Sequence, residues 1–170
     1  MKQLRKIELK RFKKKEPKHN KKIVLILENI QYAQNVANMF RTSDAAKVEQ
    51  IVLTGISHKP PFGKALQKVS RSKEKSVNWR YEKNSGKMIN FYKKNGYQII
   101  GLEITDVAQH YAEFKFSNKV CLIVGNETYG IVKNTLQKLD ASVYIPMFGR
   151  GSSLNVATAT AICLYEIIKC

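Results

Sequence analysis

Three clusters of polar residues in this 170-residue chain contain side chains that can bind anions and stabilise developing charge. The clusters hold Asn35 and Arg41, then Glu127 within the segment 124–130, and finally Ser153 and Asn155 within the segment 145–155. The guanidinium of Arg41 suits phosphate or carboxylate groups, while the amide and hydroxyl side chains can orient a bound ligand. If the fold brings them together, the clusters could form one site for a polar or anionic ligand.

Each cluster also has a purely structural interpretation. Asn35 could cap a helix while Arg41 is simply exposed. Glu127 could open a helix and benefit from its dipole, which contributes about 0.3–1 kcal/mol. The small residues at 157–161 are compatible with tight packing inside the chain or with a dimer contact. Spacing alone leaves both interpretations open.

Alternating apolar and helical segments predict the elements that position these clusters. Short runs rich in β-branched residues predict buried strands at Ile23–Leu27, Ile51–Thr54, Gln98–Ile104, Lys119–Val124 and Ser142–Ile145. Helical spacing predicts helices at Gln34–Ala46, Lys64–Ser70, Lys87–Asn95, Ile131–Leu139 and Leu154–Ile168, the last one capped by Ser152 or Ser153. This alternation predicts an α/β fold, with a mostly parallel sheet flanked by helices. Such sheets bind ligands beyond the carboxyl ends of their strands, where the clusters are expected.

Positive charge is concentrated in two blocks of the sequence. The formal net charge is +17; residues 1–22 hold 11 Lys and Arg against two acidic residues, and residues 59–94 hold the same numbers. Such blocks favour a polyanion, either nucleic acid or an anionic membrane surface, over simple solvation. Aromatic residues of the second block, including Phe62 and Trp79, could stack on unpaired bases or belong to a small core. The candidate contacts to such a polyanion are Lys13, Lys14, Lys15, Arg71, Lys73, Lys75 and Arg150.

Several functions are disfavoured by what the sequence lacks. No apolar stretch approaches the roughly 18 residues of a membrane span, and residues 1–22 lack the apolar core of a secretory signal. The segment 125–130 is not followed by the lysine of a phosphate-binding loop, and no serine lies in a nucleophile-elbow motif. The histidines and cysteines lack metal-ligand spacing, so we expect no metal. The scattered Cys121, Cys163 and Cys170 favour a reducing compartment, and a cytoplasmic location is expected.

In order and spacing, the three clusters resemble the three motifs of the SpoU/TrmH-type RNA 2′-O-ribose methyltransferases of the SPOUT superfamily. The resemblance runs from about Ile23 to Lys169, and the segment 145–157 is its most distinctive part. It implies a basic N-terminal extension at 1–22 and a methyltransferase domain at 23–170. It also implies an α/β-knot, in which the C-terminal part of the sheet forms a trefoil knot, and an obligate homodimer with active sites at the subunit interface.

The resemblance further implies S-adenosylmethionine as the cofactor, bound in the knot. The residues that would hold it are Leu102, Glu103, Val124, Gly125, Asn126, Ile145, Met147, Ser153 and Leu154. Arg41 would either take the proton of the ribose hydroxyl or hold the adjacent phosphate. Because a guanidinium is a poor base at neutral pH, we favour phosphate clamping and oxyanion stabilisation.

Other members of the clusters have supporting roles in this interpretation. Asn35 would orient Arg41 or the ribose, and Glu127 would order the cofactor loop. Ser153 and Asn155 would complete the site. In a dimer, Arg41 would act on the cofactor of the other subunit.

The chain departs from the family pattern at Ala37, at Lys47 and in the segment 70–73, Ser-Arg-Ser-Lys. None of these departures removes a proposed catalytic group, but they leave the target nucleotide open.

The leading hypothesis is therefore an S-adenosylmethionine-dependent RNA 2′-O-methyltransferase. We expect tRNA as its substrate rather than rRNA, because only a basic tail precedes the domain. One alternative is a non-catalytic RNA-binding or ribosome-assembly protein on the same scaffold, but the joint presence of the five polar site residues argues against it. Another alternative is a methyltransferase whose substrate is a small anion or a protein. Binding such a substrate needs less positive charge than the two basic blocks supply.

Overall fold

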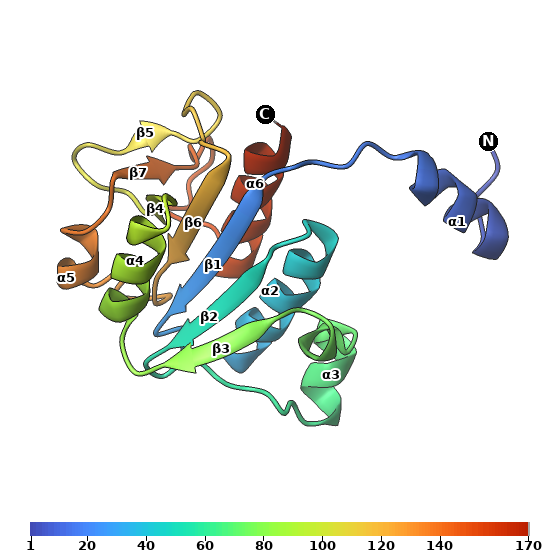
Figure 1. Cartoon of the computed structure of the whole chain (residues 1–170), viewed down its shortest axis with the longest axis horizontal. Helices are drawn as coiled ribbons and strands as arrows, with labels where there is room; N and C mark the ends of the chain where they lie inside the picture. Colours follow the sequence, from blue (N-terminus) through green and yellow to red (C-terminus); the bar gives the residue numbers. More distant parts are fainter. Residues whose placement is uncertain (170) are drawn as a thin grey trace.

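A seven-stranded parallel sheet forms the centre of the computed structural model, which describes residues 1–169 apart from the side chain of Lys13 (Figure 1). Its strands are β1 (Lys22–Glu28), β2 (Gln50–Thr54), β3 (Trp79–Glu82), β4 (Gln98–Leu102), β5 (Gln109–His110), β6 (Lys119–Val124) and β7 (Ala141–Tyr144). They lie in the order β3-β2-β1-β6-β4-β7-β5, and each neighbouring pair is parallel. The predicted α/β class and parallel sheet are confirmed.

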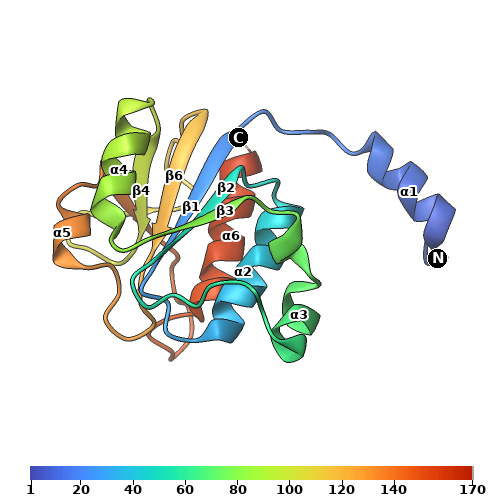
Figure 2. The same ribbon diagram turned by 60° about the horizontal axis from the view of Figure 1, so that its bottom comes forward.

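Helices cover both faces of the sheet. One face carries α2 (Ala33–Ala45), α3 (Lys64–Ser70) and α6 (Val156–Lys169), and the other carries α4 (Ser85–Lys94) and α5 (Lys133–Leu136) (Figure 2). Leu25 of β1 belongs to a buried core with Phe40 of α2 and Leu164 of α6. Its neighbour Ile26 belongs to a second core with Met88 of α4. Successive side chains of β1 thus serve opposite faces, as in parallel sheets that are buried on both sides.

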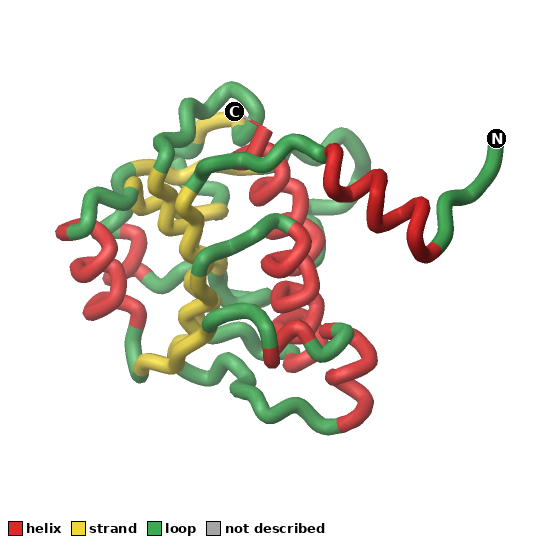
Figure 3. Tube along the Cα trace, turned by 45° about the vertical axis from the view of Figure 1, so that its right-hand side comes forward, coloured by secondary structure: helices red, strands yellow, loops and turns green. Residues whose placement is uncertain are grey.

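The basic N-terminal segment stands apart from the sheet. It contains α1 (Lys6–Lys15), from which a stretch of chain leads to β1 (Figure 3). Two side chains hold the end of this stretch against the domain. His19 Nε2 lies 3.0 Å from the carbonyl oxygen of Ala46, and Lys21 Nζ donates to the carbonyl oxygen of Phe116 at 3.1 Å. Among the described residues, no helix is long and apolar enough to cross a membrane.

All five predicted strands are present, but the prediction lacks β3 and β5. β3 is at the edge of the sheet, and its Arg80 and Tyr81 are exposed, so it has no apolar run of the kind that marks a buried strand. β5 has only two residues, too few for any periodicity.

Helix ends also differ from the prediction. α5 is shorter than predicted: it spans Lys133–Leu136, whereas the predicted helix was Ile131–Leu139. The predicted serine cap of the last helix is wrong. α6 begins at Val156, and Asn155 caps it, with its Oδ1 accepting from the amides of Ala157 at 2.9 Å and Thr158 at 3.3 Å.

The topology gathers the three polar clusters at one edge of the sheet. Because all strands are parallel, the segments after β1, β4, β6 and β7 leave the sheet at the same end. β4 lies between β6 and β7 although it precedes both in sequence, so the connection between those two strands crosses it. Segments about 100 residues apart in sequence can therefore share one site.

A buried acidic residue ties this edge together. Glu28, the last residue of β1, is 2% exposed. Its Oε2 accepts from the amide of Val132 at 2.9 Å, and its Oε1 accepts from the hydroxyl of Thr135 at 2.6 Å and from that of Ser85. Ser85 begins α4 and Thr135 lies in α5, so one side chain joins β1 to both helices of that face.

Replacing Glu28 by Gln should destabilise the fold, because the amide group would turn a donor toward buried donors. We expect the free energy of unfolding to fall by about 1–3 kcal/mol, the cost of leaving buried hydrogen-bonding groups unsatisfied. Urea unfolding followed by circular dichroism, at one fixed protein concentration, measures this. The matched control is Glu113→Gln, an exposed position where a change within about 0.5 kcal/mol is expected. Equal losses in both variants would contradict the proposed role of Glu28.

Candidate functional site

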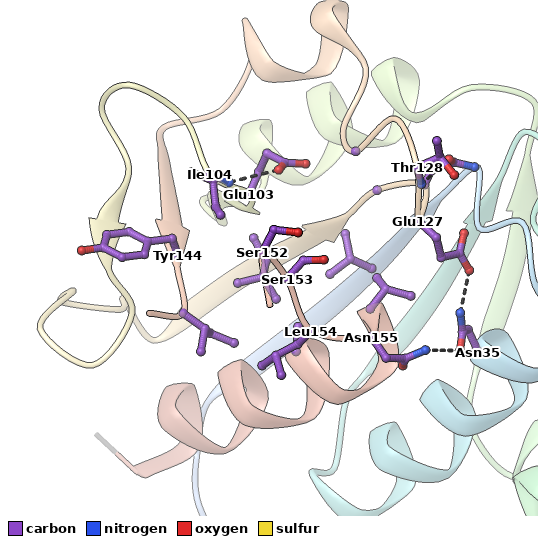
Figure 4. Close-up of a pocket in the computed structure, with 18 of the residues that line it drawn as sticks. Asn35, Glu103, Ile104, Glu127, Thr128, Tyr144, Ser152, Ser153, Leu154 and Asn155 are labelled. Carbon is purple, nitrogen blue, oxygen red and sulfur yellow. Dashed lines mark hydrogen bonds between the residues drawn. The ribbon is translucent and has the colours of Figure 1, made fainter. Parts of the chain in front are cut away.

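A cavity of about 550 Å³ lies at the carboxyl end of the sheet (Figure 4). All nine residues predicted to hold the cofactor line it, namely Leu102, Glu103, Val124, Gly125, Asn126, Ile145, Met147, Ser153 and Leu154. Asn35, Glu127 and Asn155 line it as well. The structure therefore brings members of all three predicted clusters to one cavity.

A chain of hydrogen bonds joins the clusters at one end of the cavity. The side-chain nitrogen of Asn35 donates to Glu127 Oε1 at 2.7 Å, and the side-chain oxygen of Asn35 accepts from Asn155 Nδ2 at 3.0 Å. Figure 4 shows Asn35 between these two partners. Asn155 is held in turn, because its Oδ1 caps α6. Residues from three distant segments are thus fixed relative to one another.

Glu127 interacts with a helix, but not with one that it opens. No helix begins at Glu127; the next one, α5, starts at Lys133. Instead its Oε2 accepts from the amide of Gln31 at 2.8 Å and its Oε1 from that of Tyr32 at 3.2 Å, at the N-terminus of α2. These amides are donors without partners inside the helix, so Glu127 acts as a cap supplied from far along the chain.

This environment changes the pKa of Glu127. Burial raises the pKa, but the hydrogen bonds outweigh burial, first from the side chain of Asn35 and then from the amides of Gln31, Glu127 itself and Tyr32. The net pKa of Glu127 is lower than its ordinary value. The side chain is therefore an ionised acceptor at neutral pH.

The turn that carries Glu127 is held by its own residues. Asn126 Nδ2 donates to the carbonyl oxygen of Asn29 at 2.8 Å, and Asn126 Oδ1 accepts from the amides of Thr128 and Tyr129. A Cβ at Gly125 would lie 2.2 Å from the carbonyl carbon of Gly130. Glycine is thus needed at 125 for the close approach of Gly130 within the turn.

Glu103 organises the opposite wall of the cavity. Its Oε2 accepts from the amide of Ile131 at 3.0 Å, and its Oε1 accepts from the amide of Ile104 at 3.0 Å. It therefore joins the loop after β4 to the loop after β6. Apolar side chains of Leu102, Ile145 and Leu154 also line the cavity, so apolar and polar surfaces face the same space.

Arg41 is not brought to this cavity. It is exposed on α2, does not line the cavity, and has no ion pair or side-chain hydrogen bond within residues 1–169. Arg150 is exposed in the loop before α6 and does not line it either. Four of the five residues predicted to be catalytic, Asn35, Glu127, Ser153 and Asn155, therefore line one cavity, and Arg41 does not.

The other predicted RNA contacts lie on the two basic blocks. Lys14 and Lys15 are exposed on α1, and Arg71 and Lys75 are exposed beside α3. Lys73 forms an ion pair with Asp44 at 2.8 Å. The side chain of Lys13 lies outside the described part of the chain.

Several lining residues are absent from the prediction. They are Tyr32, Ile104, Thr128, Gly130, Tyr144, Ser152, Val156 and Ala159. All eight lie within four positions of a predicted site residue, so a wider window around each motif would have included them. No group of three metal-binding side chains occurs among the described residues.

Comparison with known proteins identifies relatives along nearly the whole chain. A Bacillus subtilis relative, the 23S rRNA (guanosine(2553)-2′-O)-methyltransferase RlmP, is 33% identical over 144 residues, which cover 85% of this chain and 57% of the relative. The Escherichia coli tRNA (guanosine(18)-2′-O)-methyltransferase is 27% identical over 147 residues, covering 85% of this chain and 62% of the relative. The chain thus spans less than two thirds of either protein.

Solved structures share the fold. The crystal structure of an AdoMet-bound rRNA methyltransferase from Sinorhizobium meliloti superposes with a TM-score of 0.79 at 25% identity, covering 90% of this chain and 57% of the other. A model of the SpoU rRNA Methylase family matches residues 22–165, a span that includes β1, the loops after β4, β6 and β7 that line the cavity, and most of α6. The predicted family is confirmed, and the chain belongs to the SpoU rRNA methylase family.

Proposed function

We propose that this chain transfers a methyl group from S-adenosylmethionine to a ribose 2′-hydroxyl of RNA. The observation that carries the proposal is the cavity at the carboxyl end of the sheet, closed by the hydrogen-bonded chain Glu127–Asn35–Asn155. Two relatives that act on guanosine 2′-hydroxyls, one in rRNA and one in tRNA, support it.

The cavity suits S-adenosylmethionine in size and in chemistry. About 550 Å³ is within the range of small-molecule sites, roughly 300–1,000 Å³. Leu102, Ile145 and Leu154 offer apolar contacts to an adenine ring, while Ser153 and Asn126 offer polar ones. When bound, this cofactor supplies an electrophilic methyl group on a positively charged sulfur. The AdoMet-bound relative supports the assignment.

The side chains of the hydrogen-bonded chain act as positioning residues in this proposal. Glu127 fixes the start of α2 through the amides of Gln31 and Tyr32. Asn35 is hydrogen-bonded both to Glu127 and to Asn155, which lies at the start of α6. The walls of the cavity are thereby held before the substrate arrives. Such preorganisation can supply several kcal/mol of the reduction in barrier.

Arg41 acts on the substrate from a second subunit in this proposal. Since it does not line the cavity of its own chain, it needs a partner chain that places it at the cavity mouth. A homodimer would do this, and exposed apolar side chains in the loop before α6 and on α6 favour one: Phe148 is 96% exposed and Tyr165 is 52% exposed. There the guanidinium would hold the phosphate beside the target ribose and stabilise the developing oxyanion.

RNA is the substrate that the charge distribution favours, and tRNA stays our predicted substrate. The basic residues lie on α1 and on the segment 59–94, whereas residues 95–170, which form most of the cavity, have equal numbers of basic and acidic residues. Relatives act on both tRNA and rRNA, so both must be tested.

The direct test incubates the purified chain with radiolabelled S-adenosylmethionine and separate tRNA and rRNA fractions. We expect label on a ribose 2′-oxygen, identified by nuclease digestion and mass spectrometry, and more label on tRNA. Calorimetry should show cofactor binding without RNA. Label on a base, or no cofactor binding, would contradict the proposed function, and label on rRNA alone would contradict the tRNA preference.

Mixing two inactive variants should restore activity if Arg41 acts across a dimer. Arg41→Ala keeps the cavity intact, while Leu154→Lys places a charge where apolar contact is expected and leaves Arg41 in place. After random exchange of subunits, half of the dimers carry one complete site, so we expect about a quarter of wild-type activity. Sedimentation must show that each variant is still a dimer. Failure to restore activity in exchanged dimers would place Arg41 at the site of its own chain or outside the reaction.

Replacing Glu127 by Gln should reduce both stability and its dependence on pH. The folded chain lowers the pKa of Glu127 below the ordinary 4.5, so its stabilising effect is complete above pH 4.5 and is lost as the pH falls through the lower, folded-state pKa. We expect the wild type to exceed E127Q in unfolding free energy by about 1–3 kcal/mol at pH 7, and the difference to shrink below pH 4.5. Urea titrations across this pH range measure it. A difference that is independent of pH would show that the charge of Glu127 is not responsible.

A further inference from the structure

A second cavity, of about 310 Å³, lies beside α3 and shares no lining residue with the first. It is formed by the loop after β2, by α3, by the short 3₁₀ helix η1 (Lys73–Lys75) and by the first residue of β3. Its lining residues are Pro60, Pro61, Phe62, Gln67, Glu74, Lys75 and Trp79. The function proposed above makes no use of it.

Rigid aromatic and proline side chains form most of its wall. Phe62 is buried, with its ring at 5.5 Å from that of Phe40 in an edge-to-face contact and at 5.8 Å from that of His58 in a stacked one. The backbone of Phe62 is also fixed, because Gln67 Nε2 donates to its carbonyl oxygen at 2.7 Å. Trp79 is half-buried against the same core. Such a wall suits a flat, apolar ring.

One buried acceptor in this wall has no partner. Glu74 is 6% exposed, and its Oε2 accepts from the hydroxyl of Ser70 at 2.5 Å. Its Oε1 is buried and has no hydrogen-bond partner among the described residues. This oxygen has almost no accessible surface, so a ligand of the cavity can donate to it only when the Glu74 side chain turns toward the cavity. The gain is then the hydrogen bond that the buried acceptor lacks.

The surroundings of the cavity are strongly basic. Lys75 lines it, and Lys59, Lys64, Lys68 and Arg71 are exposed on the same loop and helices. In the whole segment 59–94, 11 Lys and Arg accompany only two acidic residues, one of which is the buried Glu74. Positive charge outside and an aromatic interior together match a nucleotide, with phosphates held at the rim and the base inside.

We infer that this cavity binds one unpaired base of the RNA substrate, and that the base carries an exocyclic amino group. The amino group of adenine, cytosine or guanine would donate to Glu74 Oε1. Uracil fits worse, because its one N–H on that edge lies between two carbonyl oxygens, which an acceptor repels. The cavity would thus recognise the base of a nucleotide other than the one that is methylated. The inference rests on the proposed function only in taking RNA as the substrate.

Trp79 makes the inference directly measurable, because it is the only tryptophan of the chain. A base stacked in the cavity should quench its fluorescence. The probes are oligocytidylate and oligouridylate of equal length, which differ chiefly in the amino group of the base. We expect oligocytidylate to quench at a concentration about tenfold lower, the effect of one hydrogen bond of ordinary strength.

Variants assign that difference to particular side chains. Glu74→Met keeps the length of the side chain but removes the acceptor, so both oligonucleotides should bind equally. The matched control Glu82→Met removes the other acidic residue of the segment and should preserve the tenfold difference. Lys75→Ala should weaken both oligonucleotides alike, because it removes a contact to phosphate that is independent of the base.

Equal quenching by both oligonucleotides in the wild type, or no quenching, would overturn the inference, and that comparison does not depend on any variant folding. A cytidine preference that persists in Glu74→Met would overturn it as well. Methyl transfer is measured on the same preparations. Transfer without base-dependent quenching refutes the second site alone, and base-dependent quenching without transfer refutes the proposed function alone.

Discussion

The side chain of Asn35 holds the candidate site together because it is at once a donor and an acceptor. Its nitrogen donates to Glu127, 92 positions later, and its oxygen accepts from Asn155, 120 positions later. Since both partners are themselves bound to helix N-termini, this one amide aligns α2 with α6 across the end of the cavity. An acid at position 35 would repel Glu127, and an apolar side chain would satisfy neither partner.

Acidic side chains also join separate segments of the chain at this edge of the sheet. Glu28 is the last residue of β1, Glu103 follows β4 and Glu127 follows β6, and each accepts from a backbone amide of another segment. Loops at the end of a parallel sheet have many amides without strand partners, and an ionised or polar oxygen satisfies them at a fixed distance. Glu103 and Glu127 line the cavity themselves, and Glu28 fixes the neighbouring segment at Val132.

Much of this architecture could be predicted from local sequence, and the exceptions have physical causes. Ile23–Leu27 and Lys119–Val124 were predictable as strands because burial on both faces requires an apolar side chain at nearly every position. β3 was not, because an edge strand with exposed Arg80 has no such requirement. The lining of the cavity was predicted through the family resemblance of the three motifs, two of which come directly after β6 and β7. The cap that Glu127 places on α2 was out of reach, because it depends on amides about 95 residues away.

The hydrogen bonds of His19 and Lys21 fix the C-terminal end of the basic N-terminal segment to the domain. On the N-terminal side of His19, the ten residues of α1 extend about 15 Å and residues 16–18 add roughly 10 Å. Any polyanion held by α1 therefore stays within some 25 Å of the domain surface, at an effective concentration on the order of millimolar. For such a polyanion, this segment would be a short tether that raises the rate of recapture after each dissociation.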